Sequence, residues 1–586
     1  MQQQTIVAGV DTGGTFTDAV ILGAGGRVLA RAKRPTRHHD LEAGTVEALG
    51  AALEQAGVPG SRIAMVGVST TLATNSVVEG RGARVGLFQI GVRKPVPLPV
   101  VGVEFVQGGH LVGGAEEAPL DVQALVGGVR RFQGHVDAYA VAASGSCFNP
   151  AHELVAAKAV SMLDPLPVSC AHEVSELPSH EERLATVALN AGLLPVMKHF
   201  LERLQAGLAG LGVAAPVRVV CGDCESLTPD QAVHRPLSTF AAGPAASALY
   251  GAREARQRGN ADALVLDVGG TTTDLVTMRD GVVPVRSGGS VIGRWETHVR
   301  AVELRTVGIG GDSHVRLERG ALRVGPRRVR PLALLGEDAL TACVLDLFGR
   351  QEADRVVLVP PECAQRAGEA ADRSPLLRHL LTHGPSTAGE LTRVLGRNLV
   401  ELEHRLEELA RRRLLVEAGF TPSDALHVLG RAGFGNADAS RSGAEVLGGR
   451  LGTSAQDLAA GVMQSASRDI EDALVERLLR CELGHDMAGL VRRRRELRLL
   501  RLDVRPMVPV VVLGAAGKAL LADLDERLGA ELIFPEEHEV GNAVGAALVA
   551  AQAAAQAEER TATTSAHGPY DCGKHTSGPL VPLLKE

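Results

Sequence analysis

The sequence predicts an α/β fold with mixed sheets, arranged as two similar halves. Apolar, β-branched runs alternate with helical patterns along most of the 586 residues. A glycine-rich motif occurs twice, once near the N-terminus and once near the middle of the chain. Glycine is abundant, with 68 residues, while aromatic residues make up only 3% of the chain. Small and aliphatic side chains must therefore form the core, as they do where helices pack closely on sheets.

The repeated motif reads Asp-x-Gly-Gly-Thr-x-Thr-Asp and occupies residues 11–18 and 267–274. Each copy follows an apolar run and leads into another, which is the pattern of a β-hairpin. The paired glycines let backbone N–H groups approach an anion closely, and the threonine hydroxyls add donors. The leading aspartate can hold Mg²⁺ directly or through water. A single copy is explained as readily by an ordinary tight turn, but two copies predict phosphate-binding loops that face one nucleotide.

The first half continues with strands and helices in alternation. We expect a helix over 40–55 and a strand over 65–68 that runs into Thr70, Thr71 and Asn75. Polar residues directly after a strand end lie where sites in α/β proteins usually form, so these three are candidate substrate-binding residues. Later elements are strands over 84–90 and 138–143, and a helix over 183–194 that Pro195 should end or kink.

The second half restarts with a strand at 264–266 and the second hairpin. A glycine-rich loop follows at 308–313, and a strand over 508–513 runs into a further glycine-rich loop at 514–518. A helix of small residues is expected over 541–555. From about residue 558 the chain is rich in Thr, Ser, Gly, His and Pro, which predicts a disordered tail.

One segment interrupts the α/β pattern. Residues 374–420 read as helix, turn, short helix, long helix and strand, which is a winged-helix-like arrangement. It can bind DNA or a partner, or it can be a structural insertion whose charges form a solvated face. The long helix carries Glu401, Glu403, Glu407 and Glu408, which would repel phosphates, so the structural interpretation is favoured.

Composition argues against several classes of protein. A net charge of −7 and a pI near 6.3 make nucleic acid an improbable partner. Eight cysteines in a chain of this length indicate a reducing compartment rather than a disulfide framework. We expect no signal peptide, because the N-terminus has no basic region, and no membrane span, because no long apolar stretch is free of charge. A cytoplasmic protein is the expectation.

Several sequence blocks, taken together and in order, resemble the hydantoinase A/5-oxoprolinase family, specifically its ATP-binding subunit. This family belongs to the superfamily of actin-like ATPases and sugar kinases. The blocks cover most of residues 5–555, and the first hairpin motif is fairly specific to the family. They are the two hairpin motifs, 69–75 with 80–82, 172–175, 182–186, 190–191, 242–246, 308–313, 421–427 and 514–518.

The resemblance implies two actin-like (ribonuclease H-like) ATPase half-domains around a nucleotide cleft. It places the N-terminal hydantoinase/oxoprolinase-type half in residues 1–200. The second half is divided between 201–373 and 421–557 by the winged-helix-like insertion at 374–420, and the tail is 558–586.

The resemblance also implies a function, with ATP and Mg²⁺ as cofactors. Family members use ATP to activate the carbonyl of a small cyclic amide of the hydantoin or 5-oxoproline type, or a ketone. They usually act with a larger, hydantoinase B-type subunit. The sequence therefore predicts an ATP-dependent hydrolase subunit that binds a small-molecule substrate. A small-molecule kinase, a carboxylase subunit and a non-catalytic ATP-driven switch module remain alternatives.

Site residues follow from the motifs and the resemblance together. Asp11 and Asp267 are the expected Mg²⁺ ligands and catalytic carboxylates. Glu173 is a candidate base, with Glu182 as an alternative, and Arg183 can bind a carboxylate. His172 joins the substrate residues in this charged cluster, which an interdomain salt-bridge network explains equally well. The expected nucleotide-binding residues are Gly13, Gly14, Thr15, Thr17, Gly243, Gly269, Gly270, Thr271, Thr272, Gly310, Gly311, Gly514 and Gly517.

The chain departs from the family pattern near one loop. Asp312 stands where a third glycine is usual, and Glu303 and Arg305 stand where the family often has an aspartate and a histidine. These differences affect the prediction of the substrate more than the prediction of the nucleotide.

Overall fold

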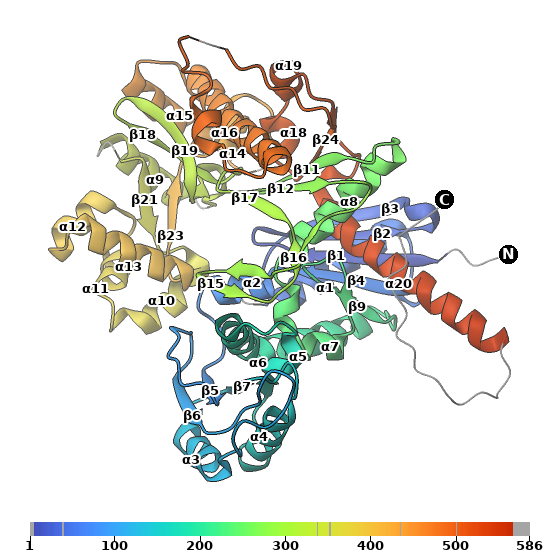
Figure 1. Ribbon diagram of the computed structural model, residues 1–586. Helices are drawn as coiled ribbons and strands as arrows, with labels where there is room; N and C mark the ends of the chain where they lie inside the picture. The colour runs from blue at the N-terminus through green and yellow to red at the C-terminus, as the bar shows by residue number, and fades with distance from the viewer. Residues whose placement is uncertain are drawn as a thin grey trace.

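The computed structural model describes residues 5–37, 40–336, 338–350, 353–433, 435–499 and 501–566. It is a mixed α/β structure with several sheets (Figure 1). The α/β class predicted from the alternating pattern is therefore confirmed.

The first large sheet has the strand order β10-β9-β4-β1-β2-β3. Neighbours β1–β2 and β2–β3 are antiparallel, whereas β1–β4 and β4–β9 are parallel. Helices α1 and α6 cover one face, where Leu49, Val66 and Leu204 are fully buried. The elements are β1 (Ile6–Thr12), β2 (Phe16–Leu22), β3 (Val28–Pro35), α1 (Leu41–Ala56), β4 (Ile63–Thr70), α2 (Leu72–Val78), α6 (His180–Gly210), β9 (Val217–Val220), β10 (Ser226–Leu227) and α7 (Pro229–His234).

The second large sheet repeats this arrangement. Its order is β17-β12-β11-β24-β25, and its strands pair in the same senses as β3-β2-β1-β4-β9. The two halves predicted from the repeated motif are thus alike in topology. The elements are α8 (Ala242–Gln257), β11 (Ala263–Val268), β12 (Thr273–Met278), β17 (Leu304–Val307), α9 (Asp338–Arg350), α14 (Pro422–Val428), α15 (Ala437–Leu451), α16 (Ala455–Leu483), α17 (Ala488–Arg493), β24 (Val510–Leu513), α18 (Gly517–Leu520), α19 (Leu524–Leu528) and β25 (Leu532–Ile533).

Helix α20 (Gly541–Ala566) joins the two halves and runs beside β1 and β4 (Figure 1). Its Val544 shares one hydrophobic cluster with Val7 of the first sheet and Val265 of the second. Glycine permits the close approach, because a Cβ on Gly67 of β4 would lie 1.9 Å from the Ala546 carbonyl oxygen of α20.

A smaller parallel sheet, β6-β5-β7-β8, lies at the lower end of the molecule in Figure 1. Its elements are β5 (Val85–Ile90), β6 (Gly102–Val106), α3 (Val122–Phe132), β7 (Ala138–Ala143), α4 (Ala151–Leu163), β8 (Val168–Cys170) and α5 (Ala171–Val174). Two-stranded ribbons pair β13 (Val285–Arg286) with β16 (Ala301–Val302), β14 (Ser290–Ile292) with β15 (Trp295–Thr297), and β18 (Ser313–Glu318) with β19 (Ala321–Arg328).

The insertion contains the element order expected from the sequence but begins earlier. Strand β21 lies between β22 and β23 and is antiparallel to both, so the insertion has its own sheet, β20-β23-β21-β22. Leu377, Leu402 and Val357 share its core. The likeness to a winged helix stays a prediction. The elements are β20 (Arg330–Pro331), β21 (Arg355–Leu358), α10 (Ala364–Ala371), α11 (Pro375–His383), β22 (Ser386–Thr387), α12 (Ala388–Leu395), α13 (Leu399–Arg411) and β23 (Val416–Gly419).

Several expected boundaries need correction. The first half does not end at residue 200, because β9 pairs in parallel with β4, with Val217 opposite Val66. The insertion does not begin at residue 374, because β21 supplies the central strand of its sheet. Helix α20 lies within the expected C-terminal part of the second half but packs against the first sheet as well. It also continues to Ala566, so residues 558–566 are helical where a disordered tail was expected. Residues 567–586 lie outside the described residues.

Helix α6 does not stop at Pro195 but extends from His180 to Gly210. The flanking side chains of Leu194 and Met197 are buried, and this packing offsets the hydrogen bond that proline removes. The helix is long and apolar enough to cross a membrane by composition, but 78% of its most apolar window is buried inside the structure. This burial is typical of a core helix in a globular protein.

Candidate nucleotide site

The two sequence motifs form hairpins with the same register. Asp11 lies opposite Asp18 in the first hairpin, and Asp267 lies opposite Asp274 in the second. The turns close in the same way, through hydrogen bonds of 3.1 Å from Gly13 N to the Phe16 oxygen and of 2.9 Å from Gly269 N to the Thr272 oxygen. The sequence repeat is therefore also a structural repeat.

The leading carboxylates, of which Asp11 is buried and Asp267 half-buried, share one amide neighbour. Asn542 on α20 donates a 3.3 Å hydrogen bond from Nδ2 to Asp11 Oδ2. Its amide also lies close enough to Asp267 to favour the charged form of that carboxyl group and so oppose the rise in its pKa. Burial raises the pKa of Asp11 and that of Asp267 to about 7. Asp11 Oδ1 has no hydrogen-bond partner among the residues that the structure describes. A buried carboxylate with a free oxygen and a half-buried one beside it fit a divalent cation.

The other predicted glycine loops converge on the second hairpin. Gly311 N donates to the Gly269 oxygen at 3.1 Å, and a Cβ on Gly310 would lie 2.6 Å from that same oxygen. Gly514 has a φ of +87°, and a Cβ there would lie 2.2 Å from the Val268 oxygen. Because only glycine fits these positions, the loops can approach the hairpin backbone closely.

Two further loops contact the site. A Cβ on Gly243, in the first turn of α8, would lie 4.0 Å from Asp11 Oδ1 and 3.6 Å from Asn542 Nδ2. Gly517, in the first turn of α18, faces Val268 and Val512. The glycine-rich loops of 13–14, 243, 269–270, 310–311 and 514–517 thus surround the two aspartates, although nucleotide binding by them stays a prediction.

The threonines of the motifs have different surroundings. The Thr17 hydroxyl is buried against the Thr36 hydroxyl at 3.2 Å, so it supports its own hairpin. Thr15 lies at the tip of the first hairpin, where its hydroxyl accepts a hydrogen bond from Arg328 of β19. Thr271 and Thr272 lie in the turn of the second hairpin and are half-buried.

The candidate substrate residues after β4 lie beside the first hairpin. Thr70 pairs with Thr12 of β1 in the parallel register, and the Thr71 hydroxyl donates to the Thr12 oxygen at 3.0 Å. Asn75 Nδ2 in turn donates to the Thr71 hydroxyl at 3.0 Å. These three residues are therefore brought next to the predicted phosphate loop.

The charged cluster around His172 belongs instead to the small sheet. Glu153 is fully buried and accepts from the backbone N–H groups of Ala143 and His172, both at 2.8 Å, and from His172 Nδ1 at 2.6 Å. Ligand atoms of Glu153, Cys170 and His172 lie within 4.8 Å of one another. Because these hydrogen bonds already use the carboxylate, we assign no metal here.

The contacts of Glu173 and Arg183 likewise give both side chains a structural role. Glu173 is exposed and its carboxylate accepts from the Cys170 N–H at the start of α5. Arg183 is buried and donates to the carbonyl oxygens of Ser175 and Leu177 and to the Ser146 hydroxyl. The structure does not bring these two side chains into contact with the hairpins, and their contacts favour the structural interpretation.

Glu303 and Arg305 each form an ion pair with α16. Glu303 pairs with Arg477 at 3.0 Å, and Arg305 pairs with Glu476 through its two terminal guanidinium nitrogens. These neighbouring residues therefore fix β17 to α16.

Sequence reasoning missed three polar residues at the hairpins. They are Asn542, Arg328 and Lys33, whose Nζ lies 2.8 Å from Asp18 Oδ1. Lys33 stands opposite Asp18 in the pairing of β2 with β3, so strand register is the signal that could have found it. For the other two residues, no local pattern gives such a signal.

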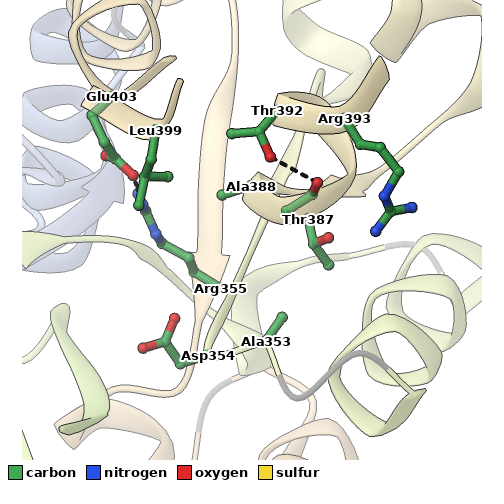
Figure 2. Close-up of a pocket in the computed structure, with 10 residues that line it drawn as sticks. Ala353, Asp354, Arg355, Thr387, Ala388, Thr392, Arg393, Leu399 and Glu403 are labelled. Carbon is green, nitrogen blue, oxygen red and sulfur yellow. Dashed lines mark hydrogen bonds and ion pairs between the residues drawn. The ribbon is translucent and has the colours of Figure 1, made fainter. Parts of the chain in front are cut away.

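A separate cavity of about 700 Å³ lies within the insertion, between residues 353–355 at the start of β21 and helices α12 and α13. Figure 2 shows Arg355 and Glu403 on one side of it and Arg393 on the other. None of the residues that line it belongs to the hairpins. The cavity is therefore distinct from the candidate nucleotide site.

Comparison with known proteins gives matches along most of the chain. The profile of the hydantoinase/oxoprolinase N-terminal region matches residues 7–163, and that of hydantoinase/oxoprolinase matches residues 183–349. Caprolactamase subunit alpha of Pseudomonas jessenii is 28% identical over 358 residues, which are 56% of this chain and 51% of that protein. The acetophenone carboxylase gamma subunit of Aromatoleum aromaticum is 27% identical over 361 residues, with 54% and 49% covered. The chain spans about half the length of these curated relatives.

Solved structures share the fold at low sequence identity. Acetone carboxylase in its nucleotide-free form has a TM-score of 0.63 at 16% identity, covering 93% of this chain and 70% of that one. The ATP-dependent caprolactamase of Pseudomonas jessenii has a TM-score of 0.60 at 21% identity, with 92% and 70% covered. At these identities the likeness concerns the fold alone.

Proposed function

The chain belongs to the hydantoinase/oxoprolinase family, and on this premise we propose that it is the ATP-binding subunit of an enzyme that activates the carbonyl of a small cyclic amide. The substrate class is of the hydantoin or 5-oxoproline type. Activation consists of phosphorylating the carbonyl oxygen with ATP, after which the ring is opened by hydrolysis.

The observation that carries this proposal is the pair of matching hairpins with Asn542 between their carboxylates. Asp11 and Asp267 come from separate sheets of the same topology, and Asn542 on α20 hydrogen-bonds Asp11 and lies near Asp267. Such a pairing suits two actin-like halves that bind one nucleotide between them. It also explains why the motif occurs twice.

In the proposed site, Asp11 and Asp267 would hold Mg²⁺. The cation would supply charge neutralisation at the phosphates. The chain's own contribution is positioning, because the backbone N–H groups of the glycine turns and the Thr15 hydroxyl can donate to phosphate oxygens. Gly243 and Gly514 would lie on the adenosine side.

The proposed substrate side is the group formed by Thr70, Thr71 and Asn75. These residues contact the first hairpin through Thr12, so a carbonyl bound there would lie near the phosphate loop. Their hydroxyl and amide groups offer both donors and acceptors, which suits an amide ring.

A second, larger subunit of the hydantoinase B type is the proposed partner. Two relatives are named as subunits, one of a caprolactamase and one of an acetophenone carboxylase. The second of these names also favours an alternative function, in which the activated carbonyl is that of a ketone and the product is a carboxylate.

The test is ADP release from Mg·ATP by the purified chain, alone and with any subunit that copurifies. The compounds are 5-oxoproline, hydantoins, other lactams, and ketones with bicarbonate. Asp267→Asn should abolish substrate-dependent release, while Asp230→Asn, an exposed aspartate on α7, should not. Stimulation by lactams or hydantoins supports the amide function, and stimulation by ketones only with bicarbonate supports carboxylation. No stimulation by any compound in either preparation would contradict both.

A further inference from the structure

Asp312, which replaces the usual glycine of its loop, has a specific partner. The Arg328 guanidinium of β19 donates to Asp312 Oδ2 from Nε at 3.3 Å and from Nη2 at 3.1 Å. The Asp312 side chain is 8% exposed and that of Arg328 is 42% exposed. A buried carboxylate is thus covered by an arginine that still faces solvent.

The same arginine crosses from the second half of the molecule to the first. Its Nη2 donates to Thr15 Oγ1, at the tip of the first hairpin, at 2.9 Å. A Cβ on Gly270, at the tip of the second hairpin, would lie 2.9 Å from Asp312 Oδ2 and 3.3 Å from Thr15 Oγ1. Arg328 therefore lies where the two hairpin tips meet.

Arg328 keeps hydrogen-bonding capacity for a ligand. A guanidinium carries five N–H donors, and the contacts with Asp312 and Thr15 use only Nε and Nη2. Nη1 has no hydrogen bond to any residue in the described part of the chain. The two N–H groups of Nη1 therefore remain available to donate to phosphate oxygens.

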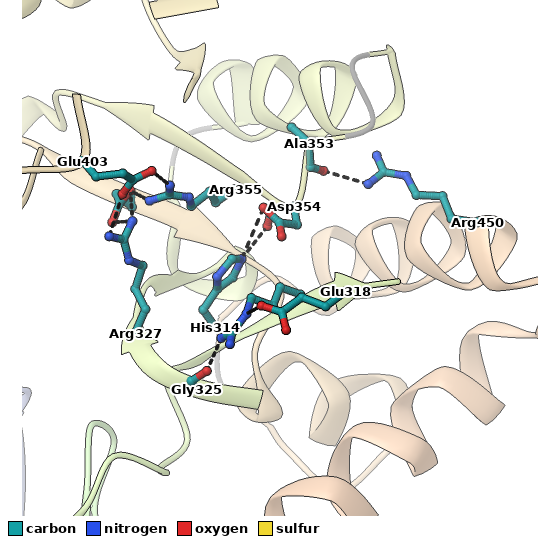
Figure 3. Close-up of polar contacts among 11 residues, drawn as sticks. His314, Glu318, Gly325, Arg327, Ala353, Asp354, Arg355, Glu403 and Arg450 are labelled. Atoms are coloured by element: carbon teal, nitrogen blue, oxygen red, sulfur yellow. Dashed lines mark hydrogen bonds and ion pairs between the residues drawn. The ribbon is translucent and has the colours of Figure 1, made fainter. Parts of the chain in front are cut away.

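The negative charge of Asp312 also requires a positively charged side chain beside it. The Asp312 carboxylate would repel a triphosphate held by the neighbouring turn of Gly269 and Gly270, unless its charge is compensated. Arg328 compensates this charge, so the ion pair as a whole is neutral beside the hairpin tips. The strand that carries Arg328 is itself fixed, because the preceding Arg327 pairs with Glu403 at 2.7 Å and with Glu417 at 3.0 Å (Figure 3).

We propose that Arg328 contacts the terminal phosphate of the bound nucleotide and that Asp312 is the positioning residue that holds it at the hairpin tips. This inference rests on the proposed function in taking ATP as the nucleotide. Gly243 and Gly514, the loops assigned to the adenosine side, approach Asp11 and Asp267 at the strand ends, whereas Arg328 contacts Thr15 at the tip. Arg328 should therefore distinguish ATP from ADP.

The test is equilibrium binding of Mg·ATP and Mg·ADP to the wild-type chain, Arg328→Ala and Arg328→Lys, with thermal unfolding as a check of folding. Arg323→Ala is the matched control, since Arg323 is an exposed arginine on the same strand. Arg328→Ala should weaken ATP binding about 10- to 100-fold and ADP binding less than about threefold. Arg328→Lys should be intermediate, and Arg323→Ala should match the wild type.

Asp312→Ala supplies a second readout. It should lower the ratio of ATP to ADP affinity, but cause no further loss in a chain that already carries Arg328→Ala, because Asp312 acts through the arginine. If the wild type binds both nucleotides and Arg328→Ala leaves their affinity ratio unchanged or raises it, the proposal for Arg328 is wrong while ATP binding stands. If the wild type binds neither nucleotide, the proposed function fails and this inference fails with it.

Discussion

Asn542, near the start of the last helix, donates its side-chain amide to the carboxylate of Asp11, at the end of the first strand. The two residues are 531 positions apart in the chain. The contact places the C-terminal helix at the base of the first hairpin, and the same amide lies near Asp267 at the base of the second. The candidate site is therefore complete only when the two ends of the described chain meet.

Asn542→Ala should lower substrate-dependent ADP release about 10- to 100-fold, because a hydrogen bond to a charged group contributes about 1.5–3 kcal/mol. Its loss leaves the Asp11 carboxylate free to reorient. Gln552→Ala, an exposed amide on the same helix, is the control and should retain activity. Equal activity of the two variants would show that the Asn542 amide does not orient the carboxylates.

Gly14→Ala should reduce ATP binding at least tenfold without loss of stability. A Cβ at Gly14 would have no other heavy atom within 4 Å, so the fold accommodates the methyl group of alanine. That methyl group would, however, obstruct a phosphate bound at the turn. Gly67→Ala provides the contrast, since its Cβ would lie 1.9 Å from a carbonyl oxygen of α20. It should lower the free energy of unfolding by about 3 kcal/mol or more. Isothermal titration and urea unfolding separate the two effects, and normal ATP binding by Gly14→Ala would contradict a phosphate at this turn.

The sequence predicted the parts of the site that are encoded locally. Each hairpin follows from eight consecutive residues, and the pairing of Asp11 with Asp18 is fixed by the turn itself. Contacts between distant segments have no such signal. The pairing of β9 with β4, the approach of Asn542 to Asp11 and the reach of Arg328 to Thr15 all depend on how separate units pack. Pro195 shows the same limit, because burial on both sides of it overrides its local tendency to end a helix.

Arg183→Lys should lower the free energy of unfolding by about 2–4 kcal/mol while changing the substrate KM less than threefold. The buried guanidinium donates to two carbonyl oxygens and the Ser146 hydroxyl, and lysine cannot replace this geometry. Urea unfolding and steady-state kinetics measure the two quantities. Arg130→Lys, at an exposed position on α3, is the control. A large rise in KM with unchanged stability would instead support carboxylate binding by Arg183.

Glu403→Gln should loosen the insertion. Arg327 and Arg355 both pair with Glu403, whose side chain is 24% exposed, so neutralising it removes a shared partner of two cations (Figure 3). We expect a loss of about 1–2 kcal/mol in stability and faster hydrogen exchange in α13. Glu401→Gln, at the 49% exposed carboxylate of the same helix, is the control. Unchanged exchange in α13 would show that the ion pairs do not hold the insertion.

The ion pair of Asp312 with Arg328 should make stability depend on pH. Burial raises the pKa of Asp312 above its usual 3.8, and Arg328 opposes this rise. A carboxyl group with a raised folded-state pKa stabilises the fold fully below the unfolded pKa, and that stabilisation is lost as pH rises through the folded pKa.

Arg328→Ala enlarges this loss because it removes the opposing charge. Since Arg328 is partly exposed, we expect the variant to be about 1–2 kcal/mol less stable than the wild type at pH 8, and nearly equal to it near pH 4. Urea unfolding at the two pH values measures this difference, and adding Asp312→Asn should abolish it. An equal loss at both pH values would mean that Arg328 stabilises the fold through packing rather than through its charge.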